Sequence, residues 1–302
     1  MALKFGLLGT GYWAAETQAA ALASHPDAEF VGVWGRDPGK AAALAQRYEV
    51  RAYADVDALI ADVDAVAVAL PPDVQAELGA RAAVAGRHLL LDKPLALSTA
   101  AADRIVAAVD RHELASLVFF TNRFYGNVRQ FLATTAAGGP WHGARATMLA
   151  SIFQPGNPYG ASPWRKDRGG LWDVGPHALS VIVPVLGPVV QVAAMNAPRA
   201  TVHLLLGHAG GAASALTLSL DAAPAATAFE FVFYGEPGTV TVPAGNTTVV
   251  EAFGAAIARL AANVRAGTPH DPCDVRFGRE VVAILAAAET ARRDGRTVRL
   301  PA

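Results

Sequence analysis

Two segments of the sequence carry side chains suited to acid–base chemistry. Lys93 follows an apolar run that predicts a buried strand, and it stands between Asp92 and Pro94. Ligands of parallel α/β sheets bind at the carboxyl ends of the strands, so this position favours a functional lysine over an ordinary surface one. In the second half, Asp173 and His177 are four residues apart. On a helix beginning at Asp173 they share one face, where the carboxylate can orient the imidazole; a helix-start aspartate with a surface histidine is the alternative.

A glycine pattern near the N-terminus indicates a nucleotide site. Gly9, Gly11 and Ala14 form G-x-G-x-x-A between a predicted strand and a predicted helix. Gly9 permits a tight turn, Gly11 lets the backbone approach a pyrophosphate, and Ala14 allows close packing of helix on strand. An ordinary glycine-rich turn is the alternative. The position on the first strand favours a dinucleotide, and the absence of G-x-x-x-x-G-K-[ST] disfavours a mononucleotide kinase.

The end of the second strand bears on the choice of cofactor. Gly35 stands where NAD-binding domains carry an acid for the adenosine ribose, and Arg36 follows it. No carboxylate repels a 2′-phosphate there, so we predict NADP rather than NAD. Asp37 precedes a proline and is predicted to cap the next helix. The expected cofactor-binding residues are Gly9, Thr10, Gly11, Tyr12, Trp13, Gly35, Arg36, Leu70, Pro71, Asp92 and Lys93.

Aromatic and basic residues in two later segments are candidates for substrate contact. The expected substrate-binding residues are Arg123, Tyr159, Trp164 and Arg165, with Asn122 and Tyr125 beside the first of them. Trp164 and Phe124 are equally compatible with a role in the core. No metal site is predicted.

The elements that must position these residues fall into two groups. Before residue 120, short apolar runs alternate with alanine-rich helical stretches, which indicates βαβ units around a parallel sheet. The predicted strands are 4–8, 29–34, 65–69, 88–91 and 116–120, and the predicted helices are 12–24, 38–48, 74–85 and 99–111, the last capped by Ser98 or Thr99.

After Phe120 the pattern changes to successive alternating segments, at 145–153, 189–196, 201–206, 213–220 and 229–234. These predict a large, mostly antiparallel open sheet, and two late helices are expected at 251–265 and 275–293. The predicted fold is therefore α/β: a dinucleotide-binding Rossmann domain over 1–120 and an α/β domain over 121–302 for substrate binding and oligomerisation. In this interpretation the final helix can belong to the second domain and still pack against the first.

Composition narrows the classes of function. The 302 residues include 25 basic and 26 acidic side chains, so no net field attracts nucleic acid. The single cysteine, Cys273, excludes an intramolecular disulfide and favours a cytoplasmic protein. The residues before the first strand lack the basic and apolar regions of a signal peptide, so none is expected. The apolar stretch 179–195 is broken by prolines and a glycine, so no membrane association is expected either.

In this order, the motifs resemble those of the Gfo/Idh/MocA family of NAD(P)-dependent oxidoreductases. The resemblance includes the turn at Gly9, Leu70-Pro71-Pro72, Asp92-Lys93-Pro94, and Gly169-Gly170 leading to Asp173 and His177. It implies that Lys93 hydrogen-bonds the reacting oxygen, His177 donates or accepts the proton, and Asp173 holds that network. It also implies a homodimer or homotetramer formed through the second sheet. Two departures stand out: Asp92 replaces the usual glutamate, and Ser180 replaces an acid common in polyol-oxidising members.

We therefore expect hydride transfer between NADP(H), or NAD(H), and a secondary alcohol or carbonyl of a sugar, cyclitol or similar small molecule. Two alternatives stay open. One is a dihydrodiol- or carbonyl-type dehydrogenase of a less polar substrate. The other is a non-catalytic NAD(P)-binding regulator, although such proteins usually lose the lysine or the histidine.

Overall fold

The computed structural model describes residues 2–301, which divide into two compact units. The first contains the chain up to Phe124 together with Thr247–Arg279, and the second contains Tyr125–Asn246 and the residues from Glu280 onward. This division differs from the predicted boundary at residue 120, because a segment from the second half of the chain belongs to the first unit. Each unit is described by itself.

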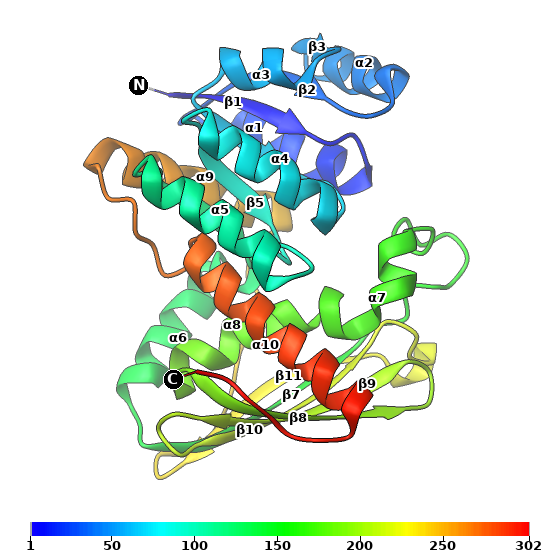
Figure 1. The fold of residues 1–302 in the computed structure, drawn as a ribbon, viewed down its shortest axis with the longest axis vertical. Coiled ribbons are helices and arrows are strands. Elements are labelled where there is room, and N and C mark those ends of the chain that lie inside the picture. Colours follow the sequence, from blue (N-terminus) through cyan, green and yellow to red (C-terminus); the bar gives the residue numbers. More distant parts are fainter. Residues whose placement is uncertain (1, 302) are drawn as a thin grey trace. The chain divides into compact units, whose positions relative to one another are not determined.

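The first unit is built on a six-stranded parallel sheet (Figure 1). Its strand order is β3-β2-β1-β4-β5-β6. The order in which strands are added along the chain reverses between β1 and β4, which is the topological switch point of the sheet. The strands are β1 (Leu3–Leu8), β2 (Ala28–Trp34), β3 (Arg51–Tyr53), β4 (Ala65–Val68), β5 (His88–Asp92) and β6 (Ser116–Phe119). β4 and β6 are buried along their whole length, as expected for strands covered by helices on both faces.

The helices of this unit agree closely with the sequence pattern. They are a π-helical turn (Ala14–Ala19) continued by α1 (Ala20–Ser24), α2 (Pro38–Arg47), α3 (Val56–Asp62), α4 (Pro72–Val84) and α5 (Thr99–Arg111). Ser98 caps α5 by accepting the Ala101 amide, and Asp37 caps α2 by accepting the Lys40 amide, so both predicted caps are confirmed. β3 and α3 were not predicted, because three- and seven-residue elements give too short a pattern.

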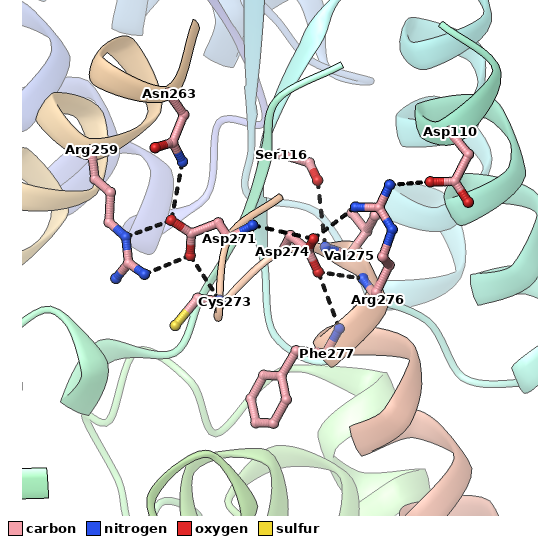
Figure 2. A network of polar contacts seen from close by, with 10 residues as sticks. All are labelled: Asp110, Ser116, Arg259, Asn263, Asp271, Cys273, Asp274, Val275, Arg276 and Phe277. Atoms are coloured by element: carbon pink, nitrogen blue, oxygen red, sulfur yellow. Dashed lines mark hydrogen bonds and ion pairs between the residues drawn. The ribbon is translucent and has the colours of Figure 1, made fainter. Parts of the chain in front are cut away.

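The segment 247–279 joins this unit through α9 (Val249–Ala266) and the start of α10 (Val275–Asp294), as Figure 2 shows. Asp271 receives two hydrogen bonds of 2.6 Å from the Arg259 guanidinium, and one of 3.0 Å from Asn263. Asp274 caps α10 by accepting the Arg276 amide, while the Arg276 guanidinium bridges to Asp110 of α5. The buried carboxylates thus have fixed partners, as buried charges require.

Cys273 lies inside this network and closes the edge of the sheet. Its carbonyl accepts a 2.7 Å hydrogen bond from the Val118 amide of β6, so the last strand of the parallel sheet has a backbone partner. The thiol is fully buried, and burial raises its pKa. A buried thiol with a raised pKa is a poor nucleophile, so Cys273 is a packing residue.

The second unit contains a seven-stranded sheet in the order β12-β11-β7-β10-β9-β8-β13. Its strands are β7 (Trp141–Leu149), β8 (Val189–Ala197), β9 (Thr201–His208), β10 (Ala213–Ser219), β11 (Ala228–Gly235), β12 (Gly238–Thr241) and β13 (Val298–Arg299). The prediction of a mostly antiparallel sheet is confirmed. Among the described strands of this second sheet, the β10–β7 pairing is parallel and the other pairings are antiparallel. The short edge strands β12 and β13 were not predicted.

One face of this sheet is covered by α6 (Gly126–Ala137), α8 (Gly175–Leu186) and the second part of α10 (Figure 1). α8 and the preceding α7 (Pro163–Asp173) form the one stretch of residues 2–301 that is long and apolar enough to cross a membrane. However, 78% of its apolar window is buried inside the protein, which is typical of a core helix. The predicted helix end, turn and strand over 179–195 are confirmed, because α8 ends at Leu186 and β8 begins at Val189.

The opposite face of the sheet is exposed and partly apolar. Met195 and Leu205 are 69% and 65% exposed, and Tyr234 is 43% exposed. Leu205 pairs across the strands with Ala215, and Tyr234 lies over Gly143, while the exposed polar residues His203 and Arg145 occupy neighbouring positions. Several large apolar side chains exposed on one sheet face are typical of an interaction surface.

Candidate functional site

The glycine turn has the geometry that close approach of a ligand requires. Gly9 has a φ of +135°, and a Cβ there would lie 2.4 Å from the Ala69 carbonyl oxygen. Gly11 is exposed, and a Cβ built on it meets no atom within 4 Å. The positive φ and the nearby Ala69 carbonyl therefore require glycine at position 9. The space above Gly11, by contrast, is open for a phosphate group to approach the amides at the start of the helix. Ala14 is fully buried against the sheet, as predicted.

The end of β2 leaves no room for an acidic side chain. A Cβ on Gly35 would lie 2.5 Å from Cγ2 of Thr10, so the two residues pack directly together. The Asp37 carboxylate is occupied by its cap on α2. Arg36 is exposed, and no ion pair or hydrogen bond of its guanidinium occurs within the described chain. Arg36 is thus the charged group available at this end of the sheet.

Tyr12 and Trp13 follow the turn. Tyr12 is 55% exposed, whereas the Trp13 ring lies 6.4 Å from the Phe119 ring at the end of β6. The Trp13 indole nitrogen is buried and has no hydrogen-bond partner among residues 2–301. A buried donor without a partner is uncommon. The Trp13 indole is therefore compatible with the wall of a binding site in which a bound ligand supplies the hydrogen-bond acceptor.

Lys93 directly follows β5, at the carboxyl edge of the sheet that also carries the glycine turn. β4 separates β1 from β5, and Leu70 and Pro71 follow it at the same edge. Strands lie about 4.8 Å apart, so the glycine turn and Lys93 leave strands roughly 10 Å apart. The carboxylate of Asp92, which replaces the glutamate usual at this position, accepts a 2.8 Å hydrogen bond from the Lys93 amide. Gln75 of α4 bonds the backbone on both sides of Lys93, a contact that the sequence pattern did not reveal.

In the second unit, the predicted helix from Asp173 is corrected. Asp173 is the last residue of α7, and His177 lies in the first turn of α8, with Val174 between the two helices. Val174 keeps right-handed helical angles of −99° and −21°, so the two side chains still stand about one turn apart. His177 is partly exposed, whereas every other residue from Gly170 to Val183 is buried. The imidazole is therefore the polar group that this buried helix pair offers to solvent or ligand.

Three predicted residues gather around Asp173. The Arg165 side chain donates from Nε to the Asp173 carboxylate at 3.1 Å, and both side chains are largely buried. The same guanidinium lies 5.0 Å from the Tyr159 ring and 4.7 Å from the Trp164 ring. The aromatic rings thus hold a cation beside the carboxylate, through cation–π contacts that strengthen where water is excluded.

The remaining candidates have defined places. Arg123 ends a short 3₁₀ turn, and its guanidinium lies 5.8 Å from the Phe277 ring within the first unit. Tyr125 covers Gly245 in the second unit, and burial raises its pKa. Ser180 is fully buried and donates to the His177 carbonyl at 2.8 Å, one turn earlier on the same helix.

A pocket of about 270 Å³ also lies in the second unit, between α7 and the β8–β9 turn. Its charged lining includes Lys166, Arg168 and Arg292. Both arginines contact Glu289 at 3.4 Å, so its carboxylate offsets one of their two positive charges, and Asp167 adds a negative charge to the lining. Within residues 2–301, no group of three or more metal-binding side chains occurs.

Comparison with known proteins identifies the N-terminal domain of the chain. Residues 3–120 match the sequence profile of GFO_IDH_MocA, described as an oxidoreductase family with an NAD-binding Rossmann fold. Residues 3–120 thus carry the NAD-binding Rossmann domain of the Gfo/Idh/MocA family. The family resemblance inferred from the motifs is thereby confirmed, as is the expectation of an oxidoreductase with a nicotinamide dinucleotide cofactor.

Relatives of known name agree with this membership. The chain is 28% identical over 250 residues to dTDP-3,4-didehydro-2,6-dideoxy-alpha-D-glucose 3-reductase of Streptomyces antibioticus, covering 78% of this chain and 74% of that protein. It is 34% identical over 126 residues to inositol 2-dehydrogenase of Rhizobium meliloti, covering 41% of this chain and 38% of that protein.

Comparison with solved structures extends the similarity from the first unit to both units. The WlbA dehydrogenase from Bordetella pertussis, crystallised with NADH and UDP-GlcNAcA, superposes with a TM-score of 0.87 at 24% identity, covering 100% of each chain. This likeness confirms the predicted α/β fold with its second sheet.

Proposed function

We propose that this Gfo/Idh/MocA protein is an NAD(P)-dependent dehydrogenase or reductase that interconverts a secondary alcohol and a carbonyl on a sugar, cyclitol or related molecule. One observation carries the proposal: the open glycine turn and Lys93 follow strands of one parallel sheet at the same edge. A cofactor bound at that turn therefore extends along the edge on which the lysine stands.

The chain's own residues have separable roles in this proposal. The nicotinamide, when bound, accepts or donates the hydride. Lys93 donates a hydrogen bond to the substrate oxygen and stabilises negative charge that develops there. His177 takes the hydroxyl proton in oxidation and returns it in reduction. Asp173, held by Arg165, places its carboxyl group about one helical turn from His177.

The substrate class rests on two supports. The named relatives act on, or were crystallised with, sugar nucleotides or inositol. In this chain, the Arg165 guanidinium lies 5.0 Å from the Tyr159 ring and 4.7 Å from the Trp164 ring, and a segment with two aromatic rings and a cation suits the apolar faces and hydroxyls of a pyranose or cyclitol. The buried Ser180 offers no acid to grip a polyol hydroxyl, which favours a substrate other than inositol.

The test is turnover on a panel. Purified protein is mixed with NADP or NADPH and with UDP- and dTDP-linked sugars, free sugars, cyclitols and apolar carbonyls, while absorbance of the reduced nicotinamide is followed. We expect turnover on at least one sugar or cyclitol. Turnover confined to apolar carbonyls would move the protein to the dihydrodiol-type branch, and cofactor binding without any turnover would indicate a regulator.

The choice of cofactor gives a separate prediction. Arg36→Ala should raise the Kd of NADPH about tenfold and leave that of NADH nearly unchanged, because the guanidinium pairs only with the 2′-phosphate. Quenching of protein fluorescence on titration with each cofactor measures both values. Arg81→Ala is the matched control, since Arg81 is an exposed arginine of α4 paired with Asp57. Equal affinity of the unaltered protein for NADPH and NADH would disprove the assignment.

We further propose that the exposed face of the seven-stranded sheet joins copies of this chain into a homodimer or homotetramer. Met195, Leu205 and Tyr234 supply its apolar contacts. Leu205→Glu should shift the protein to monomers in sedimentation velocity, because a charge buried in such an interface lacks a partner. A monomeric unaltered protein at micromolar concentration would contradict this.

A further inference from the structure

Gln75 is a buried amide whose hydrogen bonds are all directed at one short loop. It lies on α4, is 1% exposed, and is surrounded on its own helix by buried alanines and a leucine. Its Nε2 donates to the carbonyls of Asp92, Pro94 and Leu95, at 2.7, 3.0 and 3.4 Å. Its Oε1 accepts the Asp92 amide at 2.8 Å. One side chain therefore binds the backbone before and after Lys93.

The loop begins where β5 ends. Asp92 is the last residue of β5 that pairs with β6, and Pro94 has no amide hydrogen to donate. The Lys93 amide is bonded by the Asp92 carboxylate, a contact within the loop itself. Gln75 adds four hydrogen bonds that tie this loop to α4 of the sheet domain.

We propose that Gln75 is a positioning residue for Lys93: its amide holds the backbone on both sides of the lysine and so sets where the ammonium group stands. This rests on the proposed function for its kinetic consequence, but not for its structural one. A displacement of about 1 Å at a reacting group can slow a reaction about 100-fold, so the effect on turnover should be large.

Two substitutions separate positioning from stability. Gln75→Met keeps the length and removes all four hydrogen bonds, and kcat should fall about 30- to 100-fold while the Kd of NADPH changes less than about threefold. Gln75→Glu keeps the acceptor for the Asp92 amide, but a carboxylate cannot donate to the carbonyls. Burial among three carbonyls raises the pKa of that introduced carboxyl.

A pH profile then gives a signature that a merely structural role lacks. As pH falls, the introduced carboxyl takes up a proton and can donate again, so kcat of Gln75→Glu relative to the unaltered protein should rise about tenfold from about pH 9 to about pH 6. The same ratio for Gln75→Met should stay flat. Equal pH profiles for the two variants would overturn the proposal.

The matched control is Gln18, a second buried glutamine of the same unit, whose amide donates to the Val68 carbonyl at 3.2 Å. Gln18→Met should lower the melting temperature and leave kcat within about twofold, because Val68 precedes no proposed catalytic group. If Gln75→Met behaves in the same way, Gln75 serves stability alone.

A measurement without turnover keeps this question apart from the proposed function. The sequence has four lysines, at positions 4, 40, 93 and 166, so reductive methylation with ¹³C gives few NMR signals. The signal lost in Lys93→Arg is that of Lys93. In Gln75→Met this signal should shift or broaden while the other three stay in place. An unchanged Lys93 signal would overturn the proposal even if no substrate is found.

Discussion

Lys93→Met should lower kcat by about 100- to 1,000-fold, the loss typical of removing one donor that stabilises a developing oxyanion. The reason is the position of Lys93 at the end of β5, on the sheet edge that carries the glycine turn. Methionine keeps the length and apolar stem of lysine and removes only the charge and its donors. The Kd of NADPH should change much less than kcat. Stopped-flow absorbance of the nicotinamide with the best substrate of the panel measures the chemical step.

Lys4→Met is the matched control, because Lys4 is an exposed lysine on β1 of the same sheet. It should leave kcat unchanged. Lys93→Arg should recover only part of the loss, since a guanidinium keeps the charge but is wider and planar. A Lys93→Met protein that retains more than a third of kcat would show that this lysine does not stabilise the reacting oxygen.

The parallel sheet was predictable because its signals are local. β1, β2, β4, β5 and β6 were each predicted within two residues, since buried parallel strands read as short apolar runs between helical stretches. The caps at Ser98 and Asp37 were predictable for the same reason, as a cap depends on residues three positions apart. α6 was not predicted, because its apolar face is weak.

The arrangement of distant segments was not predictable. Nothing near Thr247 signals that the chain returns to the first unit; the return depends on pairs such as Arg259 with Asp271 and Arg276 with Asp110. Gln75 was missed for a related reason. A polar residue on an otherwise buried helix face is a signal, but its partners lie 17 to 20 residues away.

The candidate site divides in the same way. The residue types at Gly9, Lys93 and His177 were enough to predict a dinucleotide turn, a strand-end lysine and a helical imidazole. The contact of Arg165 with Asp173 was not predicted, because it depends on how the irregular loop before α7 folds. The sequence interpretation gave Arg165 to the substrate, whereas the structure pairs its Nε with the carboxylate.

His177→Ala should lower kcat by about 100- to 10,000-fold, the range for loss of a general acid or base. His177 is the one partly exposed residue in the buried stretch from Gly170 to Val183, so it is the residue of that stretch that can exchange a proton with a substrate most directly. The loss should be larger in kcat than in KM, because proton transfer belongs to the chemical step. Steady-state kinetics on the best substrate measure both.

Added imidazole distinguishes lost chemistry from lost structure. The alanine variant leaves a gap of the size of the missing ring, so millimolar imidazole should restore part of the turnover, in a saturable way and more at a pH where the base is neutral. His203→Ala is the control: His203 is an exposed histidine of β9 bonded to Thr217, and its loss should neither slow turnover nor create a response to imidazole. If His177→Ala keeps its kcat, the proton must come from another group, and the Arg165–Asp173 pair would then be the next candidate to vary.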